Sequence, residues 1–113
     1  MYGLAKEKKC KLHLIPSQSQ NPQTLKKVKD IFNQTLIDFL FIDGDHSYLG
    51  VKTDYKMYGP MVRKGGLIAF HDIGKNEEGG VCNLWDSIKH NYNDYKEFLF
   101  EDNQEKGIGV LYV

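Results

Sequence analysis

Apolar residues along this chain follow two different periods, and the alternation of these periods predicts strands and helices in turn. Residues 39–42 form an uninterrupted apolar run at the end of a strand predicted over residues 36–42, and a second run covers residues 65–70. Between them, Val51, Tyr55 and Tyr58 recur at helical spacing within residues 48–62, with Asp54 off this stripe. Strand, helix and strand form a βαβ unit, so the two strands are predicted to be parallel neighbours.

Shorter patterns predict a strand and a helix before this unit. Residues 11–15 alternate between polar and apolar and then turn apolar, which predicts a short strand closed by Pro16. Asn21 and Pro22 are typical of a helix start, as N-cap and first helical residue. The helical pattern that follows is predicted to end near Asn33.

The C-terminal part of the sequence predicts a helix and two strands. A loop over residues 74–80 precedes an amphipathic helix around residues 81–88, and strands are predicted over residues 96–101 and 107–113. Because five residues join these two strands, the pair must be antiparallel. The predicted fold class is α/β, a Rossmann-like three-layer sandwich whose sheet holds parallel strands and a C-terminal antiparallel pair.

Length and composition limit the class of protein. The 113 residues suffice for a single domain, residues 1–113, with a core of its own. Lysine plus arginine and aspartate plus glutamate each number 15, so no net charge attracts nucleic acid or an anionic membrane. Cys10 and Cys82 are lone cysteines, and no apolar stretch reaches the roughly 20 residues that span a bilayer. We expect a soluble, cytoplasmic protein with reduced thiols that binds neither nucleic acid nor membranes.

Side chains with catalytic chemistry follow both central strands. Asp43, Asp45 and His46 come directly after the first strand, and His71 and Asp72 come at the end of the second. Ligands of open α/β sheets bind just outside the carboxyl ends of the strands, where these groups are expected to meet. The carboxylates and the imidazole of His71 suit a divalent cation such as magnesium, manganese or calcium. His46 can accept a proton from a substrate hydroxyl.

Together, these motifs resemble a known family. The sequence IDFLFIDGDHSY over residues 37–48, the pair Gly65 and Gly66, and the sequence FHD over residues 70–72 are similar to the second half of class I S-adenosylmethionine-dependent methyltransferases. The cephalosporin-hydroxylase-like and macrocin-type O-methyltransferases are the most similar branch, over residues 11–113. The resemblance implies a metal-assisted methyl transfer from S-adenosylmethionine to the hydroxyl of a small molecule.

The same resemblance implies roles for particular residues. Asp43 and Asp72 correspond to metal ligands of the family, and His71 is a possible third ligand. His46 stands where catechol-type relatives carry a catalytic lysine, so it would be the base. Ser17 and Gln18 match the family loop that contacts the adenine of the cofactor.

One family feature is missing from the sequence. A glycine-rich turn after the first strand lets the backbone approach the cofactor, whereas Gly3 is the only glycine before Gly44. The chain is therefore expected to correspond to the C-terminal half of the domain. In the family, two strands separate the counterparts of residues 11–15 and 36–42. Either these two strands close onto each other in a five-stranded sheet, or an open apolar edge pairs with a second copy as a homodimer or domain swap.

Two other functions remain open. The first is a phosphohydrolase of the haloacid dehalogenase type, because a strand followed by Asp43, Gly44 and Asp45 supplies a nucleophile and a general acid on one turn. The second is a binding or oligomerisation module without turnover, in which the sheet persists without the cofactor half. Part of the motif also has a structural explanation, since Asp-Gly is common turn chemistry and Asp45 or Ser47 can cap the following helix.

Overall fold

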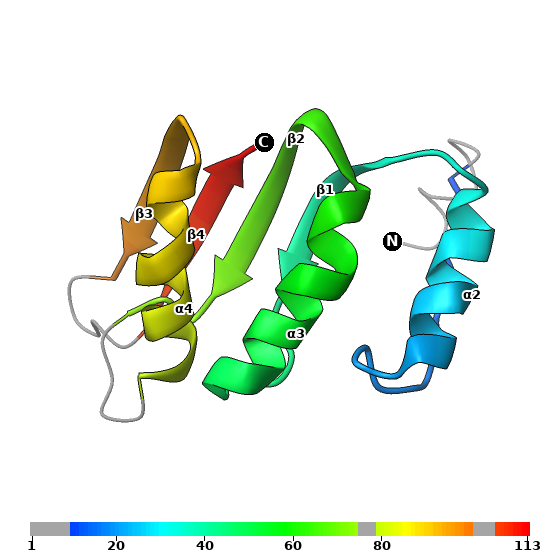
Figure 1. The fold of residues 1–113 in the computed structure, drawn as a ribbon, viewed down its shortest axis with the longest axis horizontal. Helices are drawn as coiled ribbons and strands as arrows, with labels where there is room; N and C mark the ends of the chain where they lie inside the picture. Colours follow the sequence, from blue (N-terminus) through cyan, green and yellow to red (C-terminus); the bar gives the residue numbers. More distant parts are fainter. Residues whose placement is uncertain (1–9, 75–78, 101–105) are drawn as a thin grey trace.

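A parallel βαβ unit lies at the centre of the computed structural model, which describes residues 10–74, 79–100 and 106–113 (Figure 1). Strand β1 (Ile37–Ile42) leads into helix α3 (Tyr48–Tyr58), a 3-10 turn (Gly59–Met61) and strand β2 (Val62–His71). The two strands pair in parallel, which confirms the predicted unit. The helix ends at Tyr58 because the Gly-Pro sequence at residues 59–60, which predicts a break in the helix, tightens the chain into the 3-10 turn, and β2 begins directly after it.

The C-terminal elements also follow the prediction closely. Helix α4 (Gly80–Ile88) and a 3-10 turn (Lys89–Asn91) precede strands β3 (Asp94–Leu99) and β4 (Gly107–Tyr112). The sheet order is β1-β2-β4-β3, with β4 antiparallel to both neighbours. The predicted antiparallel pair is confirmed, and β3 begins and ends two residues earlier than expected. The predicted loops at residues 74–80 and 102–106 fall mostly outside the described residues.

The predicted strand at residues 11–15 is wrong. These residues form no strand and join no sheet, and Leu12 and Leu14 are exposed. Alternation alone does not make a strand, because a strand forms only where its backbone groups pair with those of a neighbouring strand, and residues 11–15 do not pair with β1 or any other strand. The sheet of the described residues has four strands rather than five, and β1 lies at its edge. Of the two predicted alternatives, the open apolar edge is the one observed.

Helix α2 (Pro22–Phe32) begins and ends where the sequence predicts. The side chain of Asn21 caps it by accepting a hydrogen bond from the backbone N–H of Gln23 at 2.9 Å. At the other end, Asn33 adopts the left-handed conformation that closes helices, with φ 48°. The helix lies beside the sheet, next to β1, rather than over its centre (Figure 1).

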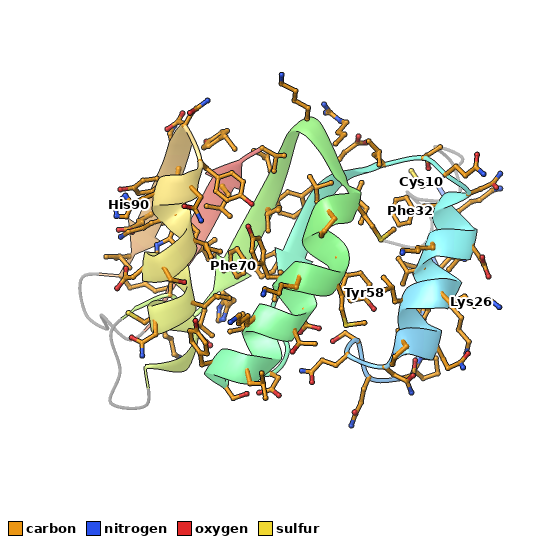
Figure 2. The ribbon with its side chains drawn as sticks, in the orientation of Figure 1. Cys10, Lys26, Phe32, Tyr58, Phe70 and His90 are labelled. Carbon is orange, nitrogen blue, oxygen red and sulfur yellow. The ribbon has the colours of Figure 1, made fainter. Side chains whose placement is uncertain are left out.

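The core lies between the sheet and helices α3 and α4, which cover the same face (Figure 1). Phe70 of β2, labelled in Figure 2, is fully buried there. Its ring centroid lies 5.8 Å from those of both Tyr55 in α3 and Trp85 in α4. The described residues form a mixed α/β fold with one helical layer, and the second helical layer of a three-layer sandwich stays a prediction. None of the helices in these residues has the length and apolarity needed to cross a membrane.

Candidate metal and methyl-transfer site

Strands β1 and β2 end side by side, and the residues at their ends bring four polar side chains together. Asp43 and His46 follow β1, whereas His71 is the last residue of β2 and Asp72 comes next. One ligand atom from each of the four lies within 4.8 Å of the others. Parallel pairing produces this arrangement, because it places both carboxyl ends on the same edge of the sheet.

The four donor groups approach one another closely. His46 Nε2 lies 3.3 Å from Asp72 Oδ2 and 3.6 Å from Asp43 Oδ1. His71 Nδ1 lies 3.0 Å from Asp72 Oδ2 and 3.3 Å from Asp43 Oδ1. Despite these distances, His71 Nδ1 is buried and has no hydrogen-bond partner among the described residues, since neither approach has the geometry of a hydrogen bond.

This donor set fits a divalent cation. A buried nitrogen without a partner is unfavourable, and two carboxylates at this separation repel each other. A cation held by Asp43, His71 and Asp72 would satisfy the nitrogen of His71 and offset the repulsion. Two carboxylates with one imidazole nitrogen are a ligand set for manganese or iron, whereas oxygen ligands alone would favour magnesium or calcium.

An unusual backbone conformation holds the carboxylate of Asp72 at the cluster. Its φ of 62° lies in the left-handed region, which few residues other than glycine adopt, aspartate among them. Its backbone N–H donates to the carbonyl of Gly107, at the start of β4, at 2.8 Å. Strained conformations of this kind concentrate at functional sites, where the surrounding structure maintains them. Here β4 supplies that support.

A close helix contact positions His46. Gly80 is the first residue of α4, and a Cβ atom built on it would lie 2.0 Å from the backbone oxygen of His46. Any other residue at this position would therefore push the helix away from the turn that carries the imidazole. The sequence does not reveal this requirement, because the contact joins segments far apart in the chain.

Asp45 has a structural role and is not a member of the cluster. Its Oδ1 accepts a hydrogen bond from the backbone N–H of Ser47 at 2.9 Å, and its Oδ2 accepts one from Gln20 Nε2 at 3.3 Å. These hydrogen bonds, that from Ser47 first, lower the pKa of Asp45 below its ordinary value. Ser47 caps α3, with its hydroxyl accepting from the N–H of Gly50. The phosphohydrolase alternative needs Asp45 as a general acid beside Asp43, and this arrangement does not favour it.

The predicted cofactor residues lie in two different hollows. Ser17 lines a groove of about 500 Å³ beside β1, together with Asp43 and Gly44, and its hydroxyl is 2.8 Å from that of Thr24. Gln18 lines a separate hollow of about 230 Å³. The structure thus places Ser17, but not Gln18, in the same groove as a predicted metal ligand.

Asp54 is a site residue that sequence reasoning missed. Its predicted place off the apolar stripe of α3 is wrong, because its side chain is 4% exposed and accepts a hydrogen bond from Ser19 Oγ at 2.7 Å. The hydroxyl of Tyr58, which projects toward α2 in Figure 2, donates to the carbonyl of Ser19 at 2.7 Å. These bonds tie the loop at residues 17–20 to α3. The spacing along the helix could have predicted this burial, because Asp54 comes three residues after buried Val51 and so lies on the same side of the helix.

Comparison with known proteins identifies the family. Residues 4–73 match a family model described as a methyltransferase domain. The chain belongs to this methyltransferase family. The matched region is more than half of the chain, and it contains both strand-end clusters and the loop at residues 17–20.

Two curated proteins of unassigned function share shorter segments with this methyltransferase domain. The uncharacterized protein R132 of Acanthamoeba polyphaga mimivirus is 56% identical over 36 residues, which are 32% of this chain and 16% of the viral protein. The uncharacterized protein y4gI of Sinorhizobium fredii (strain NBRC 101917 / NGR234) is 31% identical over 64 residues, 56% of this chain and 7% of the bacterial protein. The chain therefore spans less than a fifth of either relative.

Proposed function

We propose that this chain is the C-terminal, acceptor-activating half of an S-adenosylmethionine-dependent O-methyltransferase domain of the cephalosporin-hydroxylase-like and macrocin-type branch. In this proposal Asp43, His71 and Asp72 hold a divalent metal, and His46 is the catalytic base. The observation that carries it is the convergence of four donor atoms within 4.8 Å around a buried nitrogen that lacks a hydrogen-bond partner. The family match supports methyl transfer as the reaction.

The acceptor is proposed to be a hydroxyl of a small molecule. Asp43, His71 and Asp72 would hold a divalent cation, which would lower the pKa of a hydroxyl bound to it. His46 extends into the same cluster, and its side chain is 54% exposed, so an entering substrate can reach it. An imidazole ordinarily titrates near neutral pH, which suits it to accept the hydroxyl proton.

The transfer itself requires one displacement. The acceptor oxygen gives its proton to His46 Nε2 and attacks the methyl carbon of the sulfonium. The bond between carbon and sulfur breaks, and its electron pair stays on sulfur, which becomes the neutral thioether of S-adenosylhomocysteine. His46 Nε2 then releases the proton to solvent through its exposed side.

The cofactor is proposed to place its adenine near Ser17 and Gln18. Ser17 and Asp43 line the same groove, so a ligand in it reaches from the loop toward the strand ends. Its volume of about 500 Å³ is within the usual range for small-molecule sites. Because no glycine-rich turn precedes Gly44 in this sequence, we expect this chain to bind the cofactor weakly.

Calorimetry with S-adenosylhomocysteine tests the proposal. Titration into the protein with and without manganese chloride should give measurable binding, stronger with the metal present. Ser17→Ala should weaken this binding, while Ser87→Ala, at a distant hydroxyl of α4 that bonds to Leu84, serves as the matched control. No heat at millimolar ligand would contradict cofactor binding and favour the binding-module alternative. Phosphate release from an aryl phosphate, abolished by Asp43→Asn, would instead favour the phosphohydrolase.

A further inference from the structure

The groove beside β1 has negatively charged side chains in its walls and no positively charged ones. Apolar side chains of α2 and β1 form much of its surface, and the hydroxyls of Ser17, Ser19 and Thr24 add polar groups. Among the described residues, Asp43 and Asp54 line it, and no lysine or arginine does. Proteins that hold phosphate groups usually supply arginine or lysine, so this groove is unsuited to a phosphorylated ligand.

Asp54 lacks the partners that a buried carboxylate usually has. Its side chain lines the groove although it is almost completely buried. Within the part of the chain that the structure describes, its one hydrogen bond comes from Ser19 Oγ, which donates to Oδ1, and no ion pair includes it. Buried charges are ordinarily paired with an opposite charge. A ligand in the groove could supply that charge.

The second oxygen of this carboxylate, Oδ2, is open to the groove. A Cβ atom built on Gly44, which also lines the groove, would lie 3.5 Å from Asp54 Oδ2. Among the described residues, His71 Nδ1 is the only fully enclosed side-chain nitrogen or oxygen that lacks a partner, so Oδ2 is not enclosed. Burial and, after it, the charge of Asp54 raise the pKa of Tyr58, another residue of the groove. The negative charge of Asp54 therefore acts on groups around the groove.

We propose that this groove selects nucleosides of positive or zero charge over phosphorylated ones, and that Asp54 is the residue that determines this selectivity. The inference rests on the proposed function, which places the cofactor in the groove, and it narrows the class of ligand. S-adenosylmethionine meets the requirement, because it carries a sulfonium and an ammonium but no phosphate. Dinucleotides, which bind other folds of Rossmann type through their pyrophosphate, do not meet it.

The two carboxylates of the groove differ in what else they would bind. In the proposed function Asp43 is a metal ligand, so a bound cation would offset its charge. Asp54 is not a member of the metal cluster, and its charge remains directed at the groove. The selectivity is therefore assigned to Asp54.

Titration with three nucleosides that differ only at the 5′ position tests the proposal. The probes are 5′-amino-5′-deoxyadenosine, adenosine and adenosine 5′-monophosphate, which are positive, neutral and negative at neutral pH. NMR titration of the full chain measures the dissociation constants, with a chelator present because metal ions would themselves attract the phosphate. At about 10 mM salt the Debye length is roughly 30 Å, so Asp54 acts on a charge anywhere in the groove. The amine should bind about fivefold or more tightly than adenosine, and the phosphate more weakly by a similar factor.

Asp54→Asn separates this selectivity from a structural role. The asparagine keeps the shape of the side chain and an oxygen that can accept from Ser19, but it removes the charge. It should weaken binding of the amine and strengthen binding of the phosphate, each by about fivefold. A loss of structure would instead weaken both. The matched control is Asp86→Asn on α4, whose exposed carboxylate pairs with Lys89, and it should leave both constants unchanged.

The proposal is overturned if the wild type binds the amine and the phosphate equally, or if none of the three nucleosides binds. It is also overturned if Asp54→Asn shifts both constants in the same direction. Titration of the same protein with S-adenosylhomocysteine distinguishes this failure from that of the proposed function. If the nucleosides bind in the order of their charge but S-adenosylhomocysteine does not bind, the selectivity of the groove stands and the cofactor assignment fails.

Discussion

Replacing Asp43 with asparagine separates the stability of the fold from the proposed binding of a cation. The clustered oxygens of Asp43 and Asp72 lie within 4.8 Å of each other. At this distance two negative charges repel by about 0.9 kcal/mol at the dielectric constant of water and about 3.5 kcal/mol at an effective value of about 20. Because the side chain of Asp43 is 49% exposed, the lower figure applies. Asp43→Asn should stabilise the metal-free protein by about 1 kcal/mol.

Thermal unfolding at pH 8, where imidazoles are ordinarily neutral, measures both effects. With a chelator present, the variant should melt about 4 °C above the wild type. Manganese at about 100 times its dissociation constant should stabilise the wild type by about 2.7 kcal/mol. The variant should lose most of this gain, because it lacks one of the two carboxylates.

Asp38→Asn is the matched control, since Asp38 lies on β1, the strand that Asp43 follows, but pairs with Arg63 outside the cluster. It should retain the full manganese effect. The electrostatic reasoning fails if Asp43→Asn destabilises the metal-free protein. The assignment of Asp43 as a ligand fails if the variant and the wild type gain equally from manganese.

Two further predictions concern packing and pH. Gly80→Ala would place a Cβ atom 2.0 Å from the backbone oxygen of His46, so it should lower the free energy of unfolding by about 1–3 kcal/mol and weaken manganese binding. In Gly44→Ala the nearest contact of the new Cβ atom is 3.5 Å, so the free energy should change by less than about 0.5 kcal/mol. Urea unfolding measures both values. Equal effects of the two alanines would contradict this account of α4. The hydrogen bond from Lys89 lowers the pKa of Glu97 below its ordinary value of 4.5. The ionised Glu97 therefore stabilises the folded protein above pH 4.5, and this stabilisation is lost as the pH falls through the lower pKa that Glu97 has in the folded state. Between about pH 3 and 7, the free energy of unfolding should fall less steeply with decreasing pH in Glu97→Gln than in the wild type. Identical slopes in the two proteins would refute this role of Glu97.

The βαβ unit could be predicted from sequence because its signals are local. The apolar run of β1, the helical stripe of α3 and the cap at Asn21 each depend on neighbouring residues, and each appears in the structure where expected. The strand that was wrongly predicted at residues 11–15 shows the limit of such local signals. Its alternating pattern was correct for a strand, but residues 11–15 pair with no strand although β1 lies at the edge of the sheet of the described residues. Alternation carries no information on whether two segments will pair.

The residues of the candidate site could be predicted from the sequence, but the contacts that hold them in position could not. Strand ends placed Asp43, His46, His71 and Asp72 on one edge, and the structure brings all four together. The left-handed turn at Asp72 and the glycine contact behind His46 depend on β4 and α4, which lie far away in sequence. Such tertiary contacts leave no periodic signal, so no pattern in the chain could have revealed them.

A crystal grown with manganese chloride, with anomalous diffraction measured at the manganese edge, tests the central claim most directly. The proposed function predicts a peak between the ends of β1 and β2, about 2.0–2.6 Å from oxygens of Asp43 and Asp72 and bonded to Nδ1 of His71. Crystals of Asp72→Asn should lack it. A wild-type crystal without a peak at these residues, or with manganese bound elsewhere only, would contradict the assignment of this cluster as a metal site.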